Sequence, residues 1–400
     1  MSSFNLSKKV IYLVNDPFTI RDFERFGVKN WISYNWEVQV FDVSKILYPD
    51  YWENVDRNKI SSNFEGLKIF QNINEVLSAI NNLKNKVVFI DKLGISNLEM
   101  RIRAVARAHG KLVKISTGSL PFGSINKNIL SLFIQIMRPV IFMKKLISFV
   151  QEKFKKIKVK TYIDYLVVDG RKSIPKINEN KTLIIQAHNL DYDFLVKENQ
   201  VKSNKNSNYL VFIDQYLPYH PDYIKKGTKP PVSEDCYFSI IDHGLNAIAK
   251  SLKLNIKIAA HPLSNYASKQ KKYNYPIFEN KTFMLIRDAA VVISHCSTAL
   301  GWAVFTKKPI IFITTDEIQN ANHSRFAKNI NNYATILGKK TVNFSQLSSK
   351  DNWINHLNID CEKYEKFVEN YIKIKGSPDK PYWNIVIEYI ENDLSLLKKI

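Results

Sequence analysis

Cysteine is scarce in this 400-residue chain, which contains only Cys236, Cys296 and Cys361. Their wide spacing excludes a zinc knuckle, and the odd number of thiols favours a reducing compartment over a disulfide-bonded secreted protein. Glycine is also sparse, and its 12 residues are scattered along the chain. The sequence has neither a P-loop nor a dinucleotide-binding glycine fingerprint, which excludes the nucleotide-binding classes that depend on those motifs.

Long uncharged apolar stretches are absent as well, because no segment reaches the roughly 18 apolar residues that a membrane-spanning helix needs. The N-terminus shows no leader that ends in a small-residue cleavage site, so we expect a cytoplasmic protein. The closest to an apolar run is the segment 128–160, which is apolar early and basic later. It fits either a core helix broken at Pro139 or an interfacial segment on an anionic membrane, which predicts a peripheral location at the inner face of the cytoplasmic membrane.

Positive charge is present in excess, with 58 Lys and Arg against 37 Asp and Glu and a formal net charge of +21. Such an excess suits a nucleic acid, an anionic membrane surface or a phosphate-bearing substrate. A genome whose base composition favours Lys codons would also place an excess of lysines on solvent-exposed faces. A basic nucleic-acid-binding protein would cluster these residues with stacking aromatic side chains, whereas here they are dispersed, so we expect no nucleic-acid partner.

The first half of the chain alternates short apolar runs with helical patterns, which is typical of βαβ units and a parallel sheet. The apolar runs cover residues 10–16, 37–43, 67–71, 86–91 and 112–116. Two further strand-like runs lie at 164–173 and 182–196. We therefore predict an α/β, Rossmann-like domain over residues 1–200, which includes the basic segment 128–160.

A second alternation follows a polar, Asn- and Lys-rich linker at 197–208. Its apolar runs lie at 209–218, 256–262, 290–295 and 309–315, and its helical patterns at 233–252, 281–289 and 299–306. This pattern predicts a second Rossmann-like domain over residues 209–378. The last segment, 379–400, reads as a Trp- and Tyr-bearing helix that could pack back on the first domain.

Ligands of open parallel sheets bind at the carboxyl ends of the strands, where loops and helix N-termini face the crevice. In the second domain, polar residues follow three predicted strands. They are Asp214-Gln215-Tyr216, His261-Pro262, and the stretch from Ser294 to Thr298. Ser297 and Thr298 lie where a helix should begin, so they could hold an anion or simply cap that helix.

His261 strengthens the case for an anion site, because Pro262 favours an extended backbone that would project the imidazole into the crevice. An imidazole N–H can donate to a phosphate oxygen. Since His261 and the Ser297-Thr298 pair end successive predicted strands, we expect their side chains to share one phosphate site.

This arrangement resembles bacterial glycosyltransferases of GT-B architecture that use CMP-activated sugar acids in capsule and lipopolysaccharide assembly, such as sialyl-, polysialyl- and Kdo transferases. Those enzymes share a His-Pro motif and, some tens of residues later, a Ser-Ser/Thr motif. His261-Pro262 and Ser297-Thr298 match both in type, order and spacing. The resemblance implies two Rossmann-like domains with a cleft between them, a CMP-sugar-acid donor and a glycan or glycolipid acceptor. The implied donor-binding residues are His261, Pro262, Ser294, Ser297, Thr298 and Gln215.

The sequence departs from that family at the catalytic base. In the family, the base belongs to an acidic-acidic-Gly motif. This chain has no clean copy of that motif. Glu234-Asp235 is followed by Cys236 instead of glycine, and Val168-Asp169-Gly170 lies in the other domain and in the wrong order. Removal of the acceptor's hydroxyl proton needs a base. The candidates are Asp214, then Asp191 and Asp193 with His188 nearby, while Asp16 marks the acceptor side. Each acid would equally serve as a turn or helix-cap carboxylate.

A CMP leaving group carries one phosphate and the chain has no Asp-x-Asp loop, so we expect neither a metal nor another cofactor. Two related functions share the fold. One is a CDP-glycerol or CDP-ribitol polyol phosphate transferase, which also uses phosphate-binding His and Ser residues. The other is a UDP-N-acetylhexosamine 2-epimerase, but the stretch SHCSTALG fits its usual Gly-Gly-Ser turn poorly.

Overall fold

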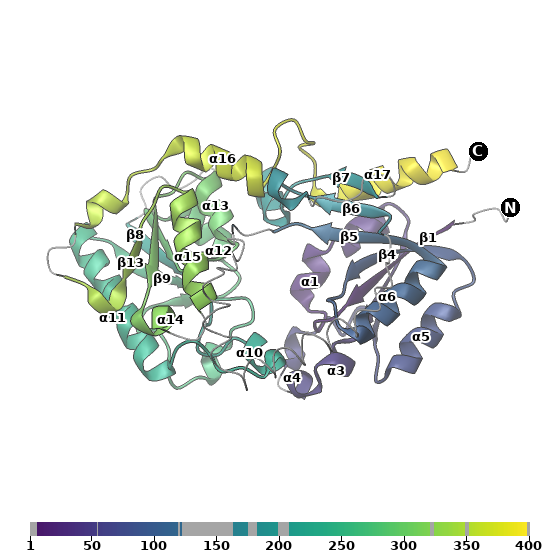
Figure 1. The fold of residues 1–400 in the computed structure, drawn as a ribbon, viewed down its shortest axis with the longest axis horizontal. Helices are drawn as coiled ribbons and strands as arrows, with labels where there is room; N and C mark the ends of the chain where they lie inside the picture. The colour runs from purple at the N-terminus through teal and green to yellow at the C-terminus, as the bar shows by residue number, and fades with distance from the viewer. Residues whose placement is uncertain are drawn as a thin grey trace, which may run out of the picture.

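The structure is a computed structural model that describes residues 6–53, 55–118, 121, 163–174, 182–198, 208–320, 324–348 and 352–397. The two interpretations of segment 128–160 concern residues outside these ranges, as does most of the expected linker. The chain forms two lobes side by side, each built on a parallel sheet (Figure 1). Among the described residues, no helix combines the length and apolar character that crossing a membrane requires.

The first domain contains a seven-stranded parallel sheet in the order β3-β2-β1-β4-β5-β6-β7. Its strands are β1 (Leu6–Val14), β2 (Glu37–Asp42), β3 (Leu67–Ile69), β4 (Lys86–Lys92), β5 (Gly110–Ser116), β6 (Tyr165–Val168) and β7 (Leu183–Gln186). In the centre of the sheet, Val10 pairs with Val38 on one side and with Val88 on the other. These strands are apolar along most of their length because helices cover both faces of the sheet.

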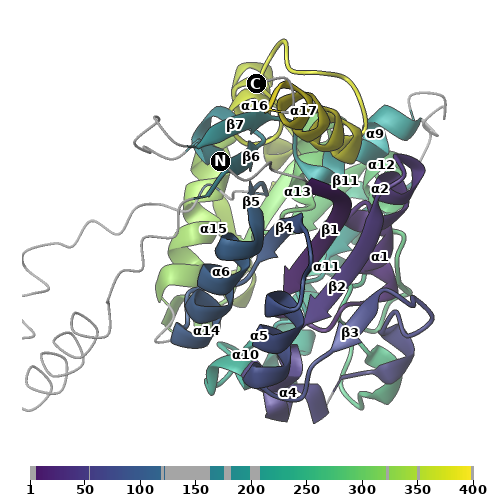
Figure 2. The same ribbon diagram turned by 90° about the vertical axis from the view of Figure 1, so that its right-hand side faces the viewer.

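Figure 2 shows α5 and α6 on one face of this sheet and α1 and α2 on the other. The helices are α1 (Ile20–Arg25), α2 (Val28–Ser33), α3 (Ser44–Leu47), α4 (Pro49–Glu53), α5 (Ile73–Asn81), α6 (Asn97–His109) and α9 (Asp193–Glu198), with short 3-10 turns η1 (Arg57–Lys59), η2 (Arg171–Ser173) and η3 (Leu190–Tyr192). α6 begins at a capping box, in which Ser96 Oγ accepts from the Glu99 N–H and Glu99 accepts from the Ser96 N–H. This reciprocal pair satisfies two backbone groups that a helix start leaves open.

The second domain contains a six-stranded parallel sheet in the order β10-β9-β8-β11-β12-β13. Its strands are β8 (Tyr209–Ile213), β9 (Asn255–Ala259), β10 (Ile277–Phe278), β11 (Val291–Ser294), β12 (Ile310–Thr314) and β13 (Thr341–Asn343). Its helices are α10 (Asp222–Lys226), α11 (Glu234–Leu252), α12 (Thr282–Asp288), α13 (Leu300–Phe305), α14 (Asp316–Asn320), α15 (Ser324–Ile336) and α16 (Cys361–Tyr371), with 3-10 turns η4 (Tyr266–Ser268), η5 (Phe344–Gln346) and η6 (Trp353–His356). Counted from β8, this is the strand order of a Rossmann sheet.

The last helix, α17 (Tyr382–Leu397), returns to the first domain and contacts α2 and β7 (Figure 1). Trp383 anchors it, since its indole N–H donates to the Arg25 carbonyl at 2.9 Å and its ring lies 5.9 Å from that of Tyr12. Gly27 has a φ of 69°, and a Cβ there would lie 2.1 Å from Trp383 Cγ. The indole therefore fills the space that the missing side chain leaves.

The prediction of an α/β fold with two Rossmann-like domains is confirmed. One expectation about the second domain is wrong. The loops that carry His261 and Ser297 do not end neighbouring strands, because β8 lies between β9 and β11. The chain switches to the other side of β8 after β10, a two-residue edge strand that the sequence pattern did not reveal. The expected motifs consequently flank the end of β8 on either side.

Candidate functional site

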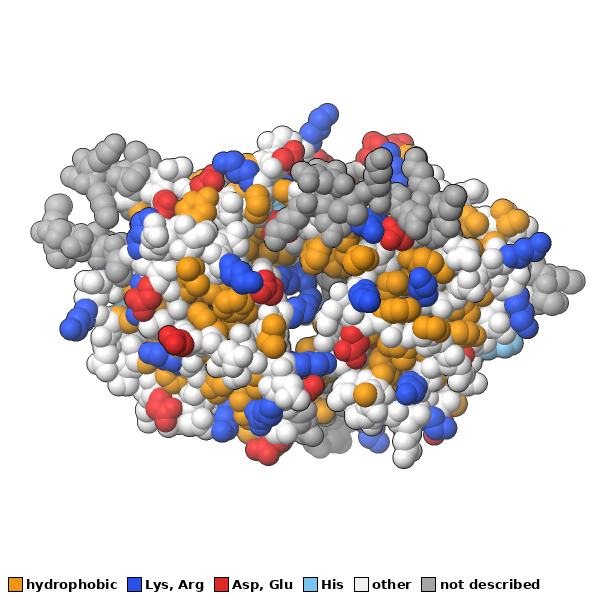
Figure 3. Space-filling model, turned by 180° about the vertical axis from the view of Figure 1, so that it is seen from behind, with side chains coloured by type: hydrophobic (Ala, Val, Ile, Leu, Met, Phe, Trp, Pro, Cys, Tyr) orange, Lys and Arg blue, Asp and Glu red, His pale blue; other side chains and the backbone are white. Residues whose placement is uncertain are grey.

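The carboxyl ends of the two sheets face each other across the space between the lobes. The strand order reverses between β1 and β4 in one sheet and between β8 and β11 in the other, which is where doubly wound sheets bind ligands. Asp16, which follows β1, forms an ion pair with Lys225 of α10. Lys59 donates to the Ser264 carbonyl at 2.8 Å. Figure 3 shows Lys and Arg side chains gathered around the hollow between the lobes.

Asp214 follows β8 but does not face the cleft, contrary to our expectation for a catalytic base. Its carboxylate is 2% exposed and accepts hydrogen bonds from the hydroxyls of Tyr266 (2.9 Å) and Tyr273 (2.8 Å). The backbone N–H groups of Tyr216 (2.8 Å) and His261 (3.3 Å) donate to it as well. Burial raises the pKa of Asp214. With four donors and no access to the cleft, this carboxylate ties the loop after β9 to the end of β8.

Gln215 makes the corresponding tie on the other side of β8. Its amide Nε2 donates to the Cys296 carbonyl at 2.7 Å, and its Oε1 accepts from the Cys296 N–H at 3.0 Å. Both polar atoms of the side chain are therefore engaged by the loop after β11. The sequence predicted a ligand-binding role for Gln215, whereas the structure shows a side chain that positions the Ser297-Thr298 loop.

His261 lies at the end of β9 and faces the first domain. Burial is the main cause that lowers the pKa of its imidazole to about 3. The neighbouring imidazole of His220 and two cations of the first domain, Arg21 and Lys59, act in the same direction. The ring is thus neutral near pH 7, and its surroundings are positively charged. Pro262 is exposed beside it.

The serine and threonine residues after β11 have three different environments. Ser294 is fully buried, which places its hydroxyl away from the cleft, contrary to the expectation of a donor contact. Ser297 Oγ accepts from the Ala299 N–H at 3.2 Å and so stabilises the turn before α13. Thr298 is exposed. Between them, His295 is a core residue, with Nδ1 at 2.8 Å from the Ile313 carbonyl and Nε2 at 3.0 Å from the Tyr237 hydroxyl.

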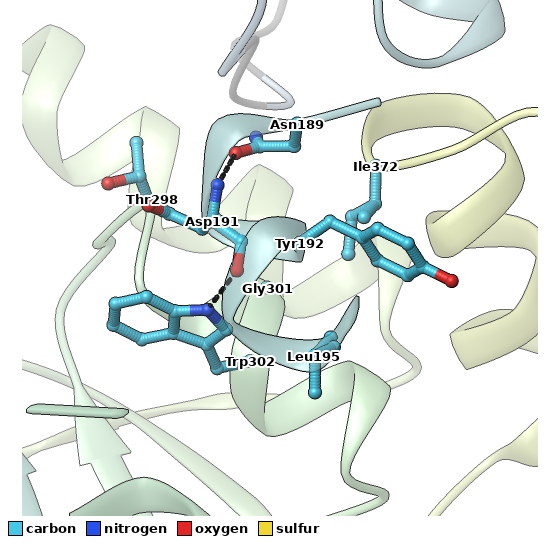
Figure 4. Close-up of a pocket in the computed structure, with 8 residues that line it drawn as sticks. All are labelled: Asn189, Asp191, Tyr192, Leu195, Thr298, Gly301, Trp302 and Ile372. Carbon is cyan, nitrogen blue, oxygen red and sulfur yellow. Dashed lines mark hydrogen bonds between the residues drawn. The ribbon is translucent and has the colours of Figure 1, made fainter. Parts of the chain in front are cut away.

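Asp191 and Thr298 line the same small pocket, although they are far apart in sequence (Figure 4). The cavity has a volume of about 10 Å³, room for a single water molecule. The Asp191 N–H donates to Asn189 Oδ1 at 2.9 Å, and the indole of Trp302 donates to the Asp191 carbonyl at 2.6 Å. Arg25 Nη2 lies 2.6 Å from the Asp191 carboxylate. The Trp302 hydrogen bond joins the end of the first domain to α13 of the second.

Asp193 and His188 belong to the segment where the domains join. Asp193 Oδ1 accepts from the Tyr382 N–H at 2.7 Å, which satisfies the start of α17. His188 is fully buried, and its Nε2 lies 2.8 Å from the Lys380 carbonyl. The geometry therefore favours a structural role for both over the catalytic role that the sequence suggested.

The sequence analysis missed His220, whose ring lies 4.9 Å from that of His261. It also missed Arg21 and Lys59, two cations of the first domain that act on His261. A signal for His220 was present, because His220-Pro221 repeats the dipeptide of His261-Pro262. The cations carried no local signal, since their grouping depends on how the two domains face each other.

Within the described ranges, no three His, Cys, Asp or Glu side chains come together as a set of metal ligands. The carboxylates at the strand ends are instead occupied by backbone N–H groups, hydroxyls and cations. The expectation that the reaction requires no metal stays a prediction.

No model of a known protein family matches this chain, and no curated protein matches its sequence. The chain is similar to the structure of the wall teichoic acid polymerase TagF, with a TM-score of 0.50 and 14% identity over 98% of this chain and 91% of that one. It is also similar to the calicheamicin glycosyltransferase CalG4 (TM-score 0.49, 12% identity, 97% and 98% covered). A UDP-GlcNAc 2-epimerase from Methanocaldococcus jannaschii is comparable (TM-score 0.45, 14% identity, 96% and 99% covered). At these identities the similarity shows the fold alone. The chain has a GT-B-like architecture.

Proposed function

We propose that this protein is a glycosyltransferase that moves a sugar acid from a CMP donor to a glycan or glycolipid acceptor. The observation that carries the proposal is the meeting of two parallel sheets, whose carboxyl ends face each other across a cationic cleft with His261 on the donor side. His261-Pro262 and Ser297-Thr298 follow the strands on either side of β8, and this arrangement supports a shared nucleotide site.

In this reaction the bond between the anomeric carbon and the phosphate oxygen breaks, while the acceptor's hydroxyl oxygen bonds to that carbon. The CMP phosphate leaves with increased negative charge. Donors aimed at that charge lower the barrier, and one such donor typically contributes on the order of 10²-fold in rate. His261 supplies an N–H, Thr298 supplies a hydroxyl, and Arg21 of the first domain supplies positive charge.

The proton of the acceptor hydroxyl needs a base that the cleft can reach. Asp214 is sealed by four donors, so we assign this role to Asp16. It follows β1, the strand at the reversal point of the acceptor domain, and its side chain is 61% exposed. Its contact with Lys225 of the opposite lobe places the carboxylate between the two domains.

Donor specificity tests the proposal directly. We expect the purified protein to release CMP from one member of a panel of CMP-sialic, CMP-Kdo, CMP-pseudaminic and CMP-legionaminic acids when an acceptor is present. His261→Ala should lower turnover and CMP affinity, whereas Asp16→Asn should abolish transfer and keep CMP affinity, measured by calorimetry. Turnover that is unchanged in both variants would contradict the assignment of the site.

A CDP-glycerol or CDP-ribitol polyol phosphate transferase is the second candidate. It is favoured by Arg21 and Lys59, two cations beside His261 that could neutralise a second phosphate. The similarity to a wall teichoic acid polymerase agrees with this alternative but shows only the fold. Adding CDP-glycerol, CDP-ribitol and UDP-GlcNAc to the donor panel separates the candidates, because only one nucleotide class should be consumed.

The expected membrane contact of segment 128–160 is a separate part of the proposal. A segment that is apolar and then basic should bind vesicles that contain anionic lipid, because its lysines gain electrostatic attraction there. In liposome flotation, the protein should rise with anionic vesicles and stay below with neutral ones. Equal recovery in the soluble fraction with both would remove the membrane contact and leave the transferase proposal intact.

A further inference from the structure

Both His-Pro dipeptides of the second domain form the same local turn. His220 Nδ1 accepts a hydrogen bond from the Asp222 N–H at 3.2 Å, and His261 Nδ1 accepts one from the Leu263 N–H at 3.2 Å. Proline has no N–H, so the first donor after each histidine is two residues further along the chain. An Nδ1 atom that accepts carries no proton. In this geometry the ring proton of each histidine lies on Nε2, from which it can be donated.

The two turns converge although they follow different strands. The rings of His220 and His261 are 4.9 Å apart between centroids, at an interplanar angle of 61°. Their loops are tied together, since the Asn265 N–H donates to the Tyr216 hydroxyl at 3.3 Å and the Tyr219 hydroxyl donates to the Lys271 carbonyl at 3.1 Å. The relative position of the two imidazoles is thus fixed by the fold of the second domain.

The charges around the pair favour an anionic ligand. Arg21 and Lys59 approach from the first domain, and both oppose protonation of His261. Asp222 opposes these cations, and its carboxylate lies 3.8 Å from His220 Nδ1. Two imidazole N–H donors beside two cations match the oxygens of a phosphate group better than they match a sugar hydroxyl.

We propose that His220 and His261 form a single clamp for a phosphate oxyanion, in which both rings donate their Nε2 protons to the same phosphate group. His220 is the unassigned half of this site. The inference rests on the proposed function only for the identity of the donor, because the clamp would bind the phosphate of any nucleotide that fits the cleft. His220 is accordingly a binding residue and not a base.

Phosphate binding and imidazole NMR test the clamp in the full-length protein. Long-range ¹H–¹⁵N spectra should show both histidines with the proton on Nε2. In calorimetry, His220→Ala and His261→Ala should each weaken the binding of inorganic phosphate and of CMP by about tenfold or more. Cytidine, which lacks the phosphate, should compete equally well in all three proteins. His109→Ala, which changes a half-buried histidine of the first domain that contacts Asn81, is the matched control and should leave CMP affinity unchanged.

His220→Gln controls for an alanine effect that comes only from a disturbed loop. Because glutamine keeps an N–H donor, this variant should recover part of the lost phosphate affinity. Two results would overturn the clamp: a proton on Nδ1 of either ring, or unchanged phosphate affinity in a folded His220→Ala protein. If phosphate affinity falls in both alanine variants but no CMP donor is consumed, the clamp is supported and the proposed donor is wrong.

Discussion

Buried aspartates at strand ends hold loops in this protein. Asp42, at the end of β2, accepts from the N–H groups of Phe18 and Ser44 at 2.9 Å each. Asp169, which follows β6, accepts from the N–H groups of Gly118 (2.6 Å) and Gly170 (2.7 Å). Asp214 repeats the arrangement in the second domain. An aspartate that follows an apolar run therefore does not by itself predict catalysis, because the same position suits a carboxylate that closes a loop.

The first prediction concerns Asp214, whose replacement should affect stability more than chemistry. In Asp214→Asn, an amide N–H₂ replaces one oxygen and faces donors that need an acceptor. We expect the free energy of unfolding to fall by about 2–4 kcal/mol, measured by urea denaturation. Asp235→Asn, the same change at an exposed carboxylate paired with Lys271, should cost less than about 1 kcal/mol. A folded, equally stable Asp214→Asn protein that loses all transfer would restore the original assignment as base.

The second prediction uses Asp42, because burial raises the pKa of its carboxyl to about 6. A carboxyl whose pKa is raised by folding stabilises the protein below its unfolded pKa, and this stability is lost as the pH rises through the folded value. The shift of about 2 units corresponds to about 3 kcal/mol. Relative to the wild type, Asp42→Asn should therefore gain about 3 kcal/mol in unfolding free energy between pH 4 and pH 7. If the unfolding free energies of the two proteins changed in parallel with pH, the raised pKa of Asp42 would be disproved.

Side-chain roles were the least predictable part of the site. The sequence located His261, Ser297 and Thr298 at strand ends, because a polar residue after a buried run is visible in the sequence. It did not distinguish Gln215, which binds the backbone of Cys296, from a side chain that binds a ligand. That distinction depends on partners far away in the sequence.

Elements with apolar runs were predicted well, including the short edge strand β3, whereas β10 and β13 were not. The central strands β1, β4, β8, β11 and β12 all coincide with apolar runs. β10 and β13 contain two and three residues, too few to show a period of two. Missing β10 led to the wrong neighbour for β11, since the chain reaches that edge before it crosses to the other side of β8.

The third prediction concerns the contact that anchors α17, where Gly27 packs against Trp383. Gly27→Ala combines a left-handed backbone with an overlap of the new Cβ and the indole, so we expect it to cost about 2–4 kcal/mol of unfolding free energy. Gly227→Ala is the matched control, because φ is +58° there and no atom lies within 4 Å of the added Cβ. It should cost only about 1 kcal/mol. Urea denaturation monitored by tryptophan fluorescence measures both, and equal losses would show that the indole does not constrain Gly27.

At the scale of the whole molecule, the two lobes touch at both ends of the cleft. At one end, the Asn189 N–H donates to the Ile372 carbonyl at 2.7 Å, and Arg171 pairs with Glu369 at 2.7 Å. At the other end, α10 meets α4, where the Lys225 ammonium lies 4.4 Å from the centroid of the Tyr51 ring. The sequence predicted the two domains but carried no signal for these contacts, which depend on the relative orientation of the lobes.

The fourth prediction is that Lys225 keeps the lobes together at the α10 end. Lys225→Ala removes the ion pair with Asp16 and the contact with Tyr51, so the cleft should open at that end. We expect a larger radius of gyration in small-angle X-ray scattering at low salt, with a loss of less than about 1 kcal/mol in unfolding free energy. Lys29→Ala breaks an exposed pair within the first domain and serves as the control. An identical scattering curve for Lys225→Ala would show that the other contacts alone hold the lobes closed.

The double attachment at the end of β8 has a thermodynamic consequence for ligand binding. Asp214 fixes the loop after β9 and Gln215 fixes the loop after β11, so both loops are already ordered in the free protein. Ordering a flexible loop during binding would cost about 1–2 kcal/mol of conformational entropy per residue. Here that entropy is lost on folding. Loop ordering should therefore offset little of the enthalpy that the new phosphate contacts contribute to nucleotide binding.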